Sequence, residues 1–199
     1  ADLRLKLIIG DLKPGQTLSI RTLAEAYDHG SMPVREALRQ LSSEGALVGE
    51  AKKAYRVPDL SANEAAKLFY VRAALEGASA EIAAKTVEPK DIKHLRQLST
   101  KMDGAWEVNN AGSFLENNFL FHSYIYAMAK NSVLEKMAEN LYIRTGPWLA
   151  KGIQDNLSRP NAWEASHDGI IDALALRDSA EARRLIEVDS GWGKQLYGD

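Results

Sequence analysis

Two arginines, Arg35 and Arg39, stand four residues apart in the segment HGSMPVREALRQLSSEG, which runs from His29 to Gly45. Apolar residues recur there with helical spacing, and Pro33 suits the first turn of a helix because its missing N–H would have no partner there. We therefore expect both guanidinium groups to project from one side of a helix. Such a group can bind guanine O6 and N7 with two hydrogen bonds, or clamp a phosphate. This is the chemistry of nucleic-acid binding.

The segments around these arginines predict a helix-turn-helix. We expect a helix over Ile20–Tyr27, a turn over Asp28–Met32 and a second helix over Pro33–Glu44, on which Arg35 is the third residue. The core side of the second helix carries Val34, Ala37, Leu38 and Leu41. In such a unit the N-terminal residues of the second helix enter the major groove.

A two-stranded wing is expected to follow the second helix. Leu47 and Val48 on one side and residues 55–57 on the other flank a polar tip of hairpin length. Lys52 and Lys53 lie on this tip. We expect the two lysines to reach the DNA backbone or the minor groove.

The charge of the chain is unevenly distributed. The 199 residues are 45% hydrophobic and 26% charged, as in an ordinary globular protein, and carry a formal net charge of −2. Residues 1–58 hold nine Lys and Arg against seven acids, or +2, which leaves −4 for the remainder. Phosphate contact is thus favoured in the N-terminal part. The other interpretation of Arg35 and Arg39 is a solvated helix face beside Glu36 and Glu44.

Several classes of protein are disfavoured by composition. The absence of cysteine excludes disulfides, thiolate metal sites and a cysteine nucleophile. The sequence contains no apolar run near the ~18 residues that span a bilayer, and its first residues lack a secretory pattern. We expect a cytoplasmic protein without a membrane partner.

The sequence predicts two domains of a mainly α fold. A first helix over Leu3–Ile9 completes a winged helix-turn-helix domain, three helices plus a small β-hairpin, over residues 1–58. Ser61 and Glu64 form a capping box that opens the second domain, residues 61–199. This domain is expected to be an all-α antiparallel helix bundle, with helices over residues 62–86, 89–109, 113–129, 133–150, 161–176 and 179–196.

Residues that could bind a metal ion occur in the C-terminal part. Asn118 and His122 are four residues apart and share a helix face, while His167 and Asp189 belong to two later helices. Two imidazoles and two oxygen side chains from three helices can converge on a divalent ion inside a bundle. The alternative is that both histidines are ordinary hydrogen-bonded residues of the core or surface.

The segments LKPGQTLSIRTLAEAY, MPVREALRQLSSEGALV and AYRVPDLS resemble the winged helix-turn-helix of the GntR transcription regulators. The resemblance implies binding to double-stranded DNA, with Arg21, Arg35 and Arg39 at positions of DNA-contacting arginines. Ser31, also expected at the DNA, replaces an arginine of the family pattern, and Ala54 replaces the wing glycine. The operator preference is therefore expected to differ from that of relatives. The match begins inside the family's first helix, which we expect to be truncated.

The segment VRAALEGASAEIAA and the helical sequence after it resemble the FadR-type C-terminal FCD ligand domain of this family. The resemblance implies a divalent metal such as Zn, Ni or Mn, and no organic cofactor. Asn118 stands in the place of the family's aspartate, one turn before His122, and Asp189 stands where its last histidine is expected. His167 matches the remaining ligand. The alternative is a metal-free cavity whose polar groups bind the effector directly.

Two arginines of this domain are candidates for effector binding. Arg72 in VRAALEG matches the arginine that opens the family's ligand domain. It could pair with an effector carboxylate, or with Glu76 at the next helical turn. Arg144 is a second cation of this kind.

These expectations combine into a DNA-binding transcription regulator, a repressor in most of the family. We expect a homodimer on a near-palindromic operator, because a two-fold protein matches a two-fold site. A small organic acid in the C-terminal domain would control its DNA affinity. The alternative is a metal-dependent hydrolase or isomerase acting on a small carboxylate in the bundle. Its nearby carboxylates, Asp168 and Asp172, carry no feature that distinguishes them from an ordinary helix surface.

Overall fold

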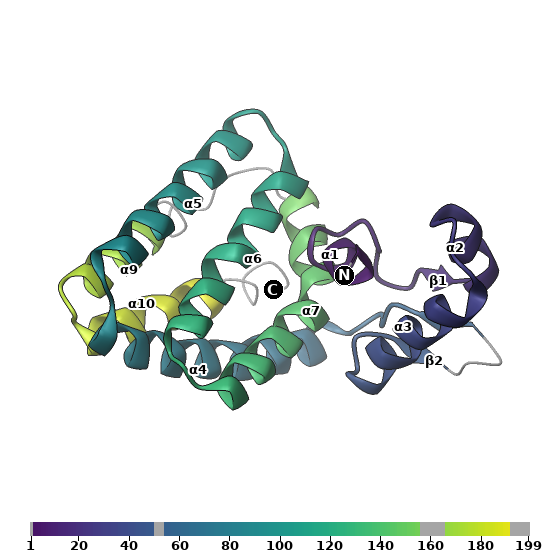
Figure 1. Ribbon diagram of the computed structural model, residues 1–199, viewed down its shortest axis with the longest axis horizontal. Helices are drawn as coiled ribbons and strands as arrows, with labels where there is room; N and C mark the ends of the chain where they lie inside the picture. The colour runs from purple at the N-terminus through teal and green to yellow at the C-terminus, as the bar shows by residue number, and fades with distance from the viewer. Residues whose placement is uncertain (1, 50–53, 156–165, 192–199) are drawn as a thin grey trace.

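The computed structural model of the chain describes residues 2–49, 54–155 and 166–191. A small N-terminal domain of short helices and a three-stranded sheet is followed by a larger domain of long helices (Figure 1). The predicted mainly α class is therefore confirmed. Over these ranges, no helix is both long and apolar enough to cross a membrane.

The N-terminal domain contains the predicted helix-turn-helix and wing strands, together with one strand that was not predicted. Its elements are α1 (Asp2–Ile8), β1 (Thr17–Leu18), α2 (Ile20–Ala26), α3 (Ser31–Ser43), β2 (Val48–Gly49) and β3 (Tyr55–Arg56). Strand β3 lies between β1 and β2, antiparallel to both, so that Leu18 and Gly49 both lie opposite Tyr55. Strand β1 was missed because two residues are too few to show an alternating pattern. The wing tip with Lys52 and Lys53 falls outside the described residues.

Helix α3 is amphipathic, and its apolar side packs on the rest of the domain. Val34, Leu38 and Leu41 are buried. The helix begins two residues before the predicted start, so Arg35 is its fifth residue and not its third. Its first turn has no side-chain cap, since Gly30 occupies the N-cap position.

The C-terminal domain is a bundle of long helices. They are α4 (Ala62–Thr86), α5 (Pro89–Glu107), α6 (Ala111–Met128), α7 (Ser132–Asp155), α9 (Ser166–Ala175) and α10 (Ser179–Gly191). Both hydrogen bonds of the predicted capping box are present at the start of α4, between Ser61 and Glu64. Helix α7 continues five residues beyond its predicted end at Ala150. Residues 161–165 and 192–196, the ends of two predicted helices, lie outside the described ranges.

The two domains share a core through helix α7, against which α1 packs (Figure 1). Tyr142 and Ile143 of α7 belong to the same buried cluster as Leu7 and Ile8 of α1. The close approach depends on Gly146, where a Cβ atom would lie 2.8 Å from the Leu7 carbonyl oxygen and 2.9 Å from Ile8 Cα. The N-terminal domain therefore completes its core with residues of the C-terminal bundle.

A second contact joins α7 to the end of helix α3. Asn140 Nδ2 donates to the Glu44 carbonyl oxygen at 2.9 Å, just after the last residue of α3. Arg4 of α1 donates to the Glu44 carboxylate at 2.5 and 2.6 Å. The C-terminal end of α3 is thus held by both α1 and α7.

We predict that Gly146→Ala loosens the contact between α1 and α7. Its new methyl group would meet backbone atoms of α1, and overpacking of this kind typically costs ~1–3 kcal/mol. Gly104→Ala on α5 is the matched control, because no atom lies within 4 Å of its Cβ position. There, alanine should stabilise the helix by ~0.5–1 kcal/mol. Urea unfolding checks both, and equal stability of the two variants would contradict the packing at Gly146.

Candidate functional site

The exposed side of helix α3 carries the residues expected at DNA. Ser31, Arg35 and Arg39 follow one another at intervals of four, so they line one side of the helix. Ser31 and Arg39 are exposed and Arg35 is half-buried. The structure therefore brings the three residues together along one side of α3, next to its buried face.

The exposed arginines are held by acidic neighbours on their own helices. Arg39 donates to the Glu36 carboxylate at 2.6 and 2.9 Å, which raises the pKa of the guanidinium group. Arg21 of α2 donates to Glu25 at 2.9 Å and has 88% of its side chain exposed. Exposed ion pairs of this kind are weak. A phosphate group can therefore replace the glutamates at low cost.

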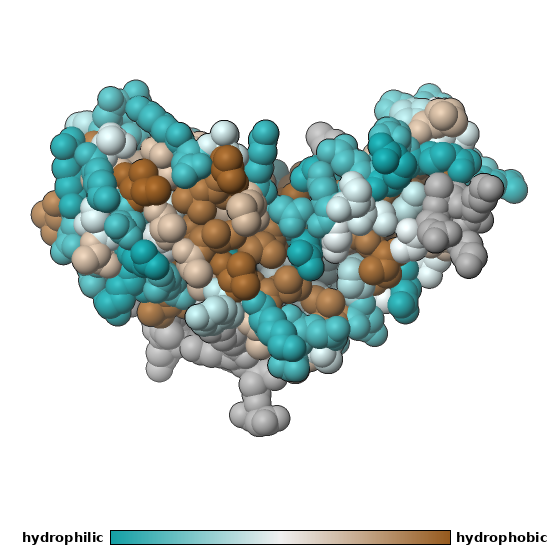
Figure 2. All heavy atoms as spheres, turned by 90° about the horizontal axis from the view of Figure 1, so that it is seen from below, coloured by the Kyte–Doolittle hydropathy of each residue, from teal (hydrophilic) through white to brown (hydrophobic). Residues whose placement is uncertain are grey.

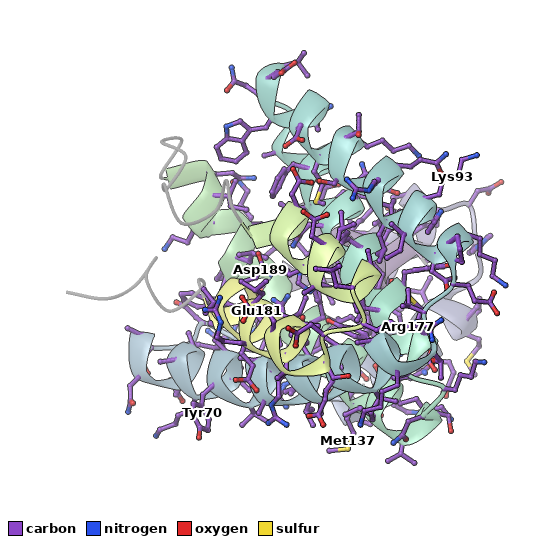
Figure 3. The ribbon with its side chains drawn as sticks, turned by 90° about the vertical axis from the view of Figure 1, so that its left-hand side faces the viewer. Tyr70, Lys93, Met137, Arg177, Glu181 and Asp189 are labelled. Atoms are coloured by element: carbon purple, nitrogen blue, oxygen red, sulfur yellow. The ribbon has the colours of Figure 1, made fainter. Side chains whose placement is uncertain are left out.

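A buried polar cluster lies at the centre of the C-terminal bundle, where five helices meet. Helix α4 provides Arg72 and Glu76, and α7 provides Tyr142 and Thr145. The predicted metal ligands come from the other three helices: Asn118 and His122 from α6, His167 from α9 and Asp189 from α10. Figure 3 shows Asp189 on α10 within the bundle. The structure thus brings the four predicted ligands together.

The carboxylate of Glu76, which is fully buried, connects both halves of this cluster. It accepts hydrogen bonds from Arg72 Nε, from His122 Nδ1 at 2.6 Å and from Ser190 Oγ at 2.6 Å. Burial alone would raise the pKa of Glu76, but Arg72 and His122 outweigh it and lower the pKa to about 2. Glu76 is therefore a permanent carboxylate that fixes the orientation of the His122 ring.

The other ring nitrogen of His122 points toward the predicted ligands. Its Nε2 atom lies 3.1 Å from Asp189 Oδ2, but it has no hydrogen bond of good geometry to any described residue. Burial lowers the pKa of His122, whereas Glu76 and Asp189 raise it, with a net increase to about 9. The two carboxylates, Glu76 and Asp189, therefore favour the protonated form of the His122 ring. A metal-binding histidine is typically oriented in this way, with its second nitrogen bound to a carboxylate.

The remaining ligand atoms lie at distances suited to a shared metal ion. His167 Nε2 is 3.1 Å from Asn118 Oδ1 and 3.7 Å from Asp189 Oδ1. One ligand atom from each of His122, His167 and Asp189 lies within 4.8 Å of the others. A tetrahedral ion with ligands at 2.0–2.2 Å would place neighbouring ligand atoms about 3.4 Å apart. Burial lowers the pKa of His167, which favours the neutral imidazole that a metal requires. The residues present therefore fit a divalent ion that displaces the proton from His122 Nε2 when it binds.

Tyr142 connects this cluster to the interface between the domains. Its hydroxyl accepts a hydrogen bond from Asn118 Nδ2 at 2.7 Å, and its ring lies 3.8 Å from the Arg72 guanidinium carbon. The same ring packs with Phe119, at a centroid distance of 5.0 Å, in the core shared with the N-terminal domain. A movement of the Asn118 side chain would therefore be transmitted to that core through Tyr142.

The two arginines expected to bind an effector occupy different places. Arg72 is buried and pairs with Glu76, while its NH1 atom donates to Thr145 Oγ1 at 3.4 Å. Its charge is already neutralised, so an effector carboxylate would have to displace Glu76. Arg144 lies beside Gly45, where a Cβ atom would be 3.3 Å from Arg144 Nε. It belongs to the contact between the domains, and this placement gives no support to effector binding.

Sequence reasoning missed the central roles of Glu76 and Tyr142. Glu76 was considered only as a partner of Arg72, although it is flanked by alanine, glycine and serine, which signal a closely packed helix. Tyr142 carried no signal, because its partners Asn118 and Arg72 come from distant parts of the chain.

Comparison with known proteins identifies two families along the chain. Residues 1–57 match the family described as bacterial regulatory proteins, gntR family, and residues 67–188 match the FCD domain. The HTH-type transcriptional regulator McbR of Escherichia coli (strain K12) is 34% identical over 148 residues, which cover 74% of this chain and 67% of that protein. The gluconate operon transcriptional repressor of Bacillus subtilis (strain 168) is 30% identical over 141 residues, covering 70% of this chain and 57% of the repressor.

A solved structure is also similar over nearly the whole chain. The structure of E. coli McbR/YncC superposes with a TM-score of 0.88 at 28% sequence identity. The superposition covers 99% of this chain and 95% of that one.

We predict that Glu76→Gln strongly destabilises the protein. Breaking a buried ion pair while one charge stays buried typically costs ~3–5 kcal/mol. Glu116→Gln on the exposed side of α6 is the matched control and should change stability by less than ~0.5 kcal/mol. Urea unfolding at neutral pH measures both, and equal midpoints would contradict the role of Glu76.

The loss of stability caused by Glu76→Gln should also depend on pH. A carboxyl group with a lowered pKa stabilises the folded state above its ordinary pKa of 4.5, and this contribution is lost as the pH falls toward 2. The stability difference between the wild type and Glu76→Gln should therefore shrink over that range. A difference that grows on acidification would contradict the assignment.

Proposed function

The chain belongs to the GntR family of bacterial regulatory proteins and carries their FCD domain, and we propose that it represses transcription under the control of a small organic acid. Its family and its relatives are transcription regulators, so the chain is a regulator and not an enzyme. The observation that carries the proposed control is the convergence of His122, His167 and Asp189 inside the domain that contacts α3.

Operator binding is proposed to use the exposed side of helix α3. Arg35 and Arg39 would reach base edges or phosphates in the major groove, with Ser31 beside them. Arg21 would contact the DNA backbone from α2. Lys52 and Lys53 are proposed to act from the wing tip. A homodimer would place two such helices on the two halves of a near-palindromic operator.

Control is proposed to involve a divalent metal such as Zn, Ni or Mn. His122, His167 and Asp189 would hold it, with the Asn118 amide oxygen as a fourth ligand. The bound ion would supply a positive centre to which a carboxylate of the organic acid can bind. Arg72 would act on the site indirectly, because it neutralises the Glu76 carboxylate that orients the His122 ring.

Helix α7 is proposed to carry the signal from this site to the DNA-binding domain. A metal that binds Asn118 Oδ1 would change the position of the amide group that donates to Tyr142. Tyr142 lies two residues from Asn140, which holds the end of α3 at Glu44. Two arrangements of α7 would therefore give two positions of α3, and hence two DNA affinities.

Arg35→Ala should weaken operator binding while leaving the fold intact. A bidentate arginine provides ~1–3 kcal/mol of base discrimination, which corresponds to a loss of roughly 5- to 150-fold in affinity. Arg96→Ala on α5 is the control, because Arg96 is an exposed arginine of the other domain whose bond is to Asp172. Fluorescence anisotropy on an operator selected from random duplexes gives both affinities. Unchanged binding by Arg35→Ala would show that α3 does not dock as proposed.

Asn118→Asp should tighten metal binding, because a carboxylate replaces a neutral amide beside the cation. Asn117→Asp is the matched control, since Asn117 donates instead to the Ser113 carbonyl oxygen on its own helix. His167→Ala should abolish binding. Elemental analysis after dialysis against Zn²⁺, Ni²⁺ or Mn²⁺ gives the metal content, and a metal at 100 times its Kd should add ~2.7 kcal/mol of stability. A chain that takes up no metal and is destabilised by Asn118→Asp would favour the metal-free cavity.

A further inference from the structure

Helix α3 carries one large apolar side chain that the packing of the helix does not explain. Val34, Leu38 and Leu41 form a row that is buried against the rest of the domain. Met32, in the first turn, is instead 71% exposed to solvent. A single exposed apolar residue is common on protein surfaces, so the position of Met32 on the helix decides what it can do.

Met32 lies on the side of α3 that faces solvent. Residues 32, 36, 39 and 43 are four, three and four residues apart, so they share one side of the helix, and all four are exposed. At roughly 100° per residue, this side lies opposite the buried row. Ser31 and Arg35 lie closer to that row. The Met32 side chain therefore points more directly away from the protein than theirs do.

The residues before Met32 are small. Gly30 at the N-cap has no side chain, and Ser31 ends at its hydroxyl group. Met32 therefore has the longest side chain in the first turn, Ser31–Val34. This side chain is unbranched and ends in a polarisable thioether and a methyl group, so it adapts to irregular apolar surfaces.

The surroundings of Met32 are polar, but they carry little net charge. In the view of Figure 2, the N-terminal domain shows mainly hydrophilic residues, whereas apolar residues gather over the C-terminal bundle. On α3, Glu36 follows Met32 by one turn and accepts hydrogen bonds from Arg39 at 2.6 and 2.9 Å. These two charges offset each other. An apolar group on a nearly neutral side of a helix suits base edges better than phosphates.

We propose that Met32 recognises a thymine in the operator, by packing its thioether and methyl groups against the C5-methyl group of the base. Thymine is the base that presents a methyl group in the major groove, whereas cytosine presents an amino group. In a helix-turn-helix, the N-terminal residues of the second helix contact base edges in this groove. The inference deepens the proposed function and rests on it, since α3 must enter the major groove.

The spacing along α3 also predicts where this thymine lies. Met32 precedes Arg35 by three residues, which amounts to about 4.5 Å along the helix axis. Successive base pairs are about 3.4 Å apart. The thymine should therefore lie within about two base pairs of the base that Arg35 contacts, once in each half of a two-fold operator.

Deoxyuridine tests this contact, because it pairs as thymine does and lacks only the C5-methyl group. An operator is selected from random duplexes with the wild-type chain, and its thymines are replaced by deoxyuridine, one symmetric pair of positions at a time. At one such pair, the replacement should weaken wild-type binding about tenfold, as expected for the loss of two buried methyl groups. Fluorescence anisotropy measures each affinity.

Met32→Ala should remove this sensitivity to deoxyuridine. Because Met32 is exposed, the variant should unfold at the same urea concentration as the wild type. At the predicted positions it should bind the thymine and deoxyuridine operators equally well. Met137→Ala is the matched control, since Met137 is another exposed helical methionine, 52% exposed, but lies on α7 of the other domain. It should keep the tenfold difference.

The outcomes separate this contact from the proposed function. Wild-type binding that needs one thymine methyl group in each half-site, a need that Met32→Ala removes, supports recognition by Met32. A wild type that tolerates deoxyuridine at every position overturns it, and so does a Met32→Ala variant that keeps the difference. In both cases, operator binding that still depends on Arg35 leaves the proposed docking of α3 standing. A chain with which no operator can be selected overturns both proposals.

Discussion

The charged centre of the C-terminal bundle depends on the burial of one carboxylate, Glu76. A buried charge is costly unless it is paired, and Glu76 is paired by Arg72, His122 and Ser190 from helices α4, α6 and α10. This requirement fixes how the helices meet, and it leaves His122 Nε2 directed at Asp189. The same interactions that satisfy a buried charge thus prepare a group of ligand atoms for a cation.

Helix α7 relates this centre to the DNA-binding domain. Tyr142 touches Asn118 and Arg72 on one side and packs into the core of the N-terminal domain on the other. Gly146 allows α1 to approach, and Asn140 holds the end of α3. The N-terminal domain is therefore not independent of the bundle. A core shared in this way transmits a rearrangement because packed side chains cannot deform continuously.

Features that depend on local spacing could be predicted from the sequence. The apolar side of α3, the capping box at Ser61 and the shared face of Asn118 and His122 all follow from helical periodicity. Features that depend on distant partners could not. Strand β1 exists only because β3 pairs with it, and the position of Arg144 beside Gly45 joins two distant parts of the chain. The hydrogen bond from Asn118 to Tyr142 joins residues on two different helices, and no local pattern in the sequence indicates that they lie close together.

The most direct measurement of coupling between the two sites compares operator affinity of the full chain with and without Zn²⁺, in the wild type and in Tyr142→Phe. Coupling between two sites is typically worth 1–3 kcal/mol, so metal loading should change wild-type affinity at least about fivefold. Tyr142→Phe keeps the ring but loses the hydroxyl that Asn118 contacts, and it should reduce that change. Equal operator affinity of the metal-free and metal-loaded wild type, with metal uptake verified, would contradict control through this cluster.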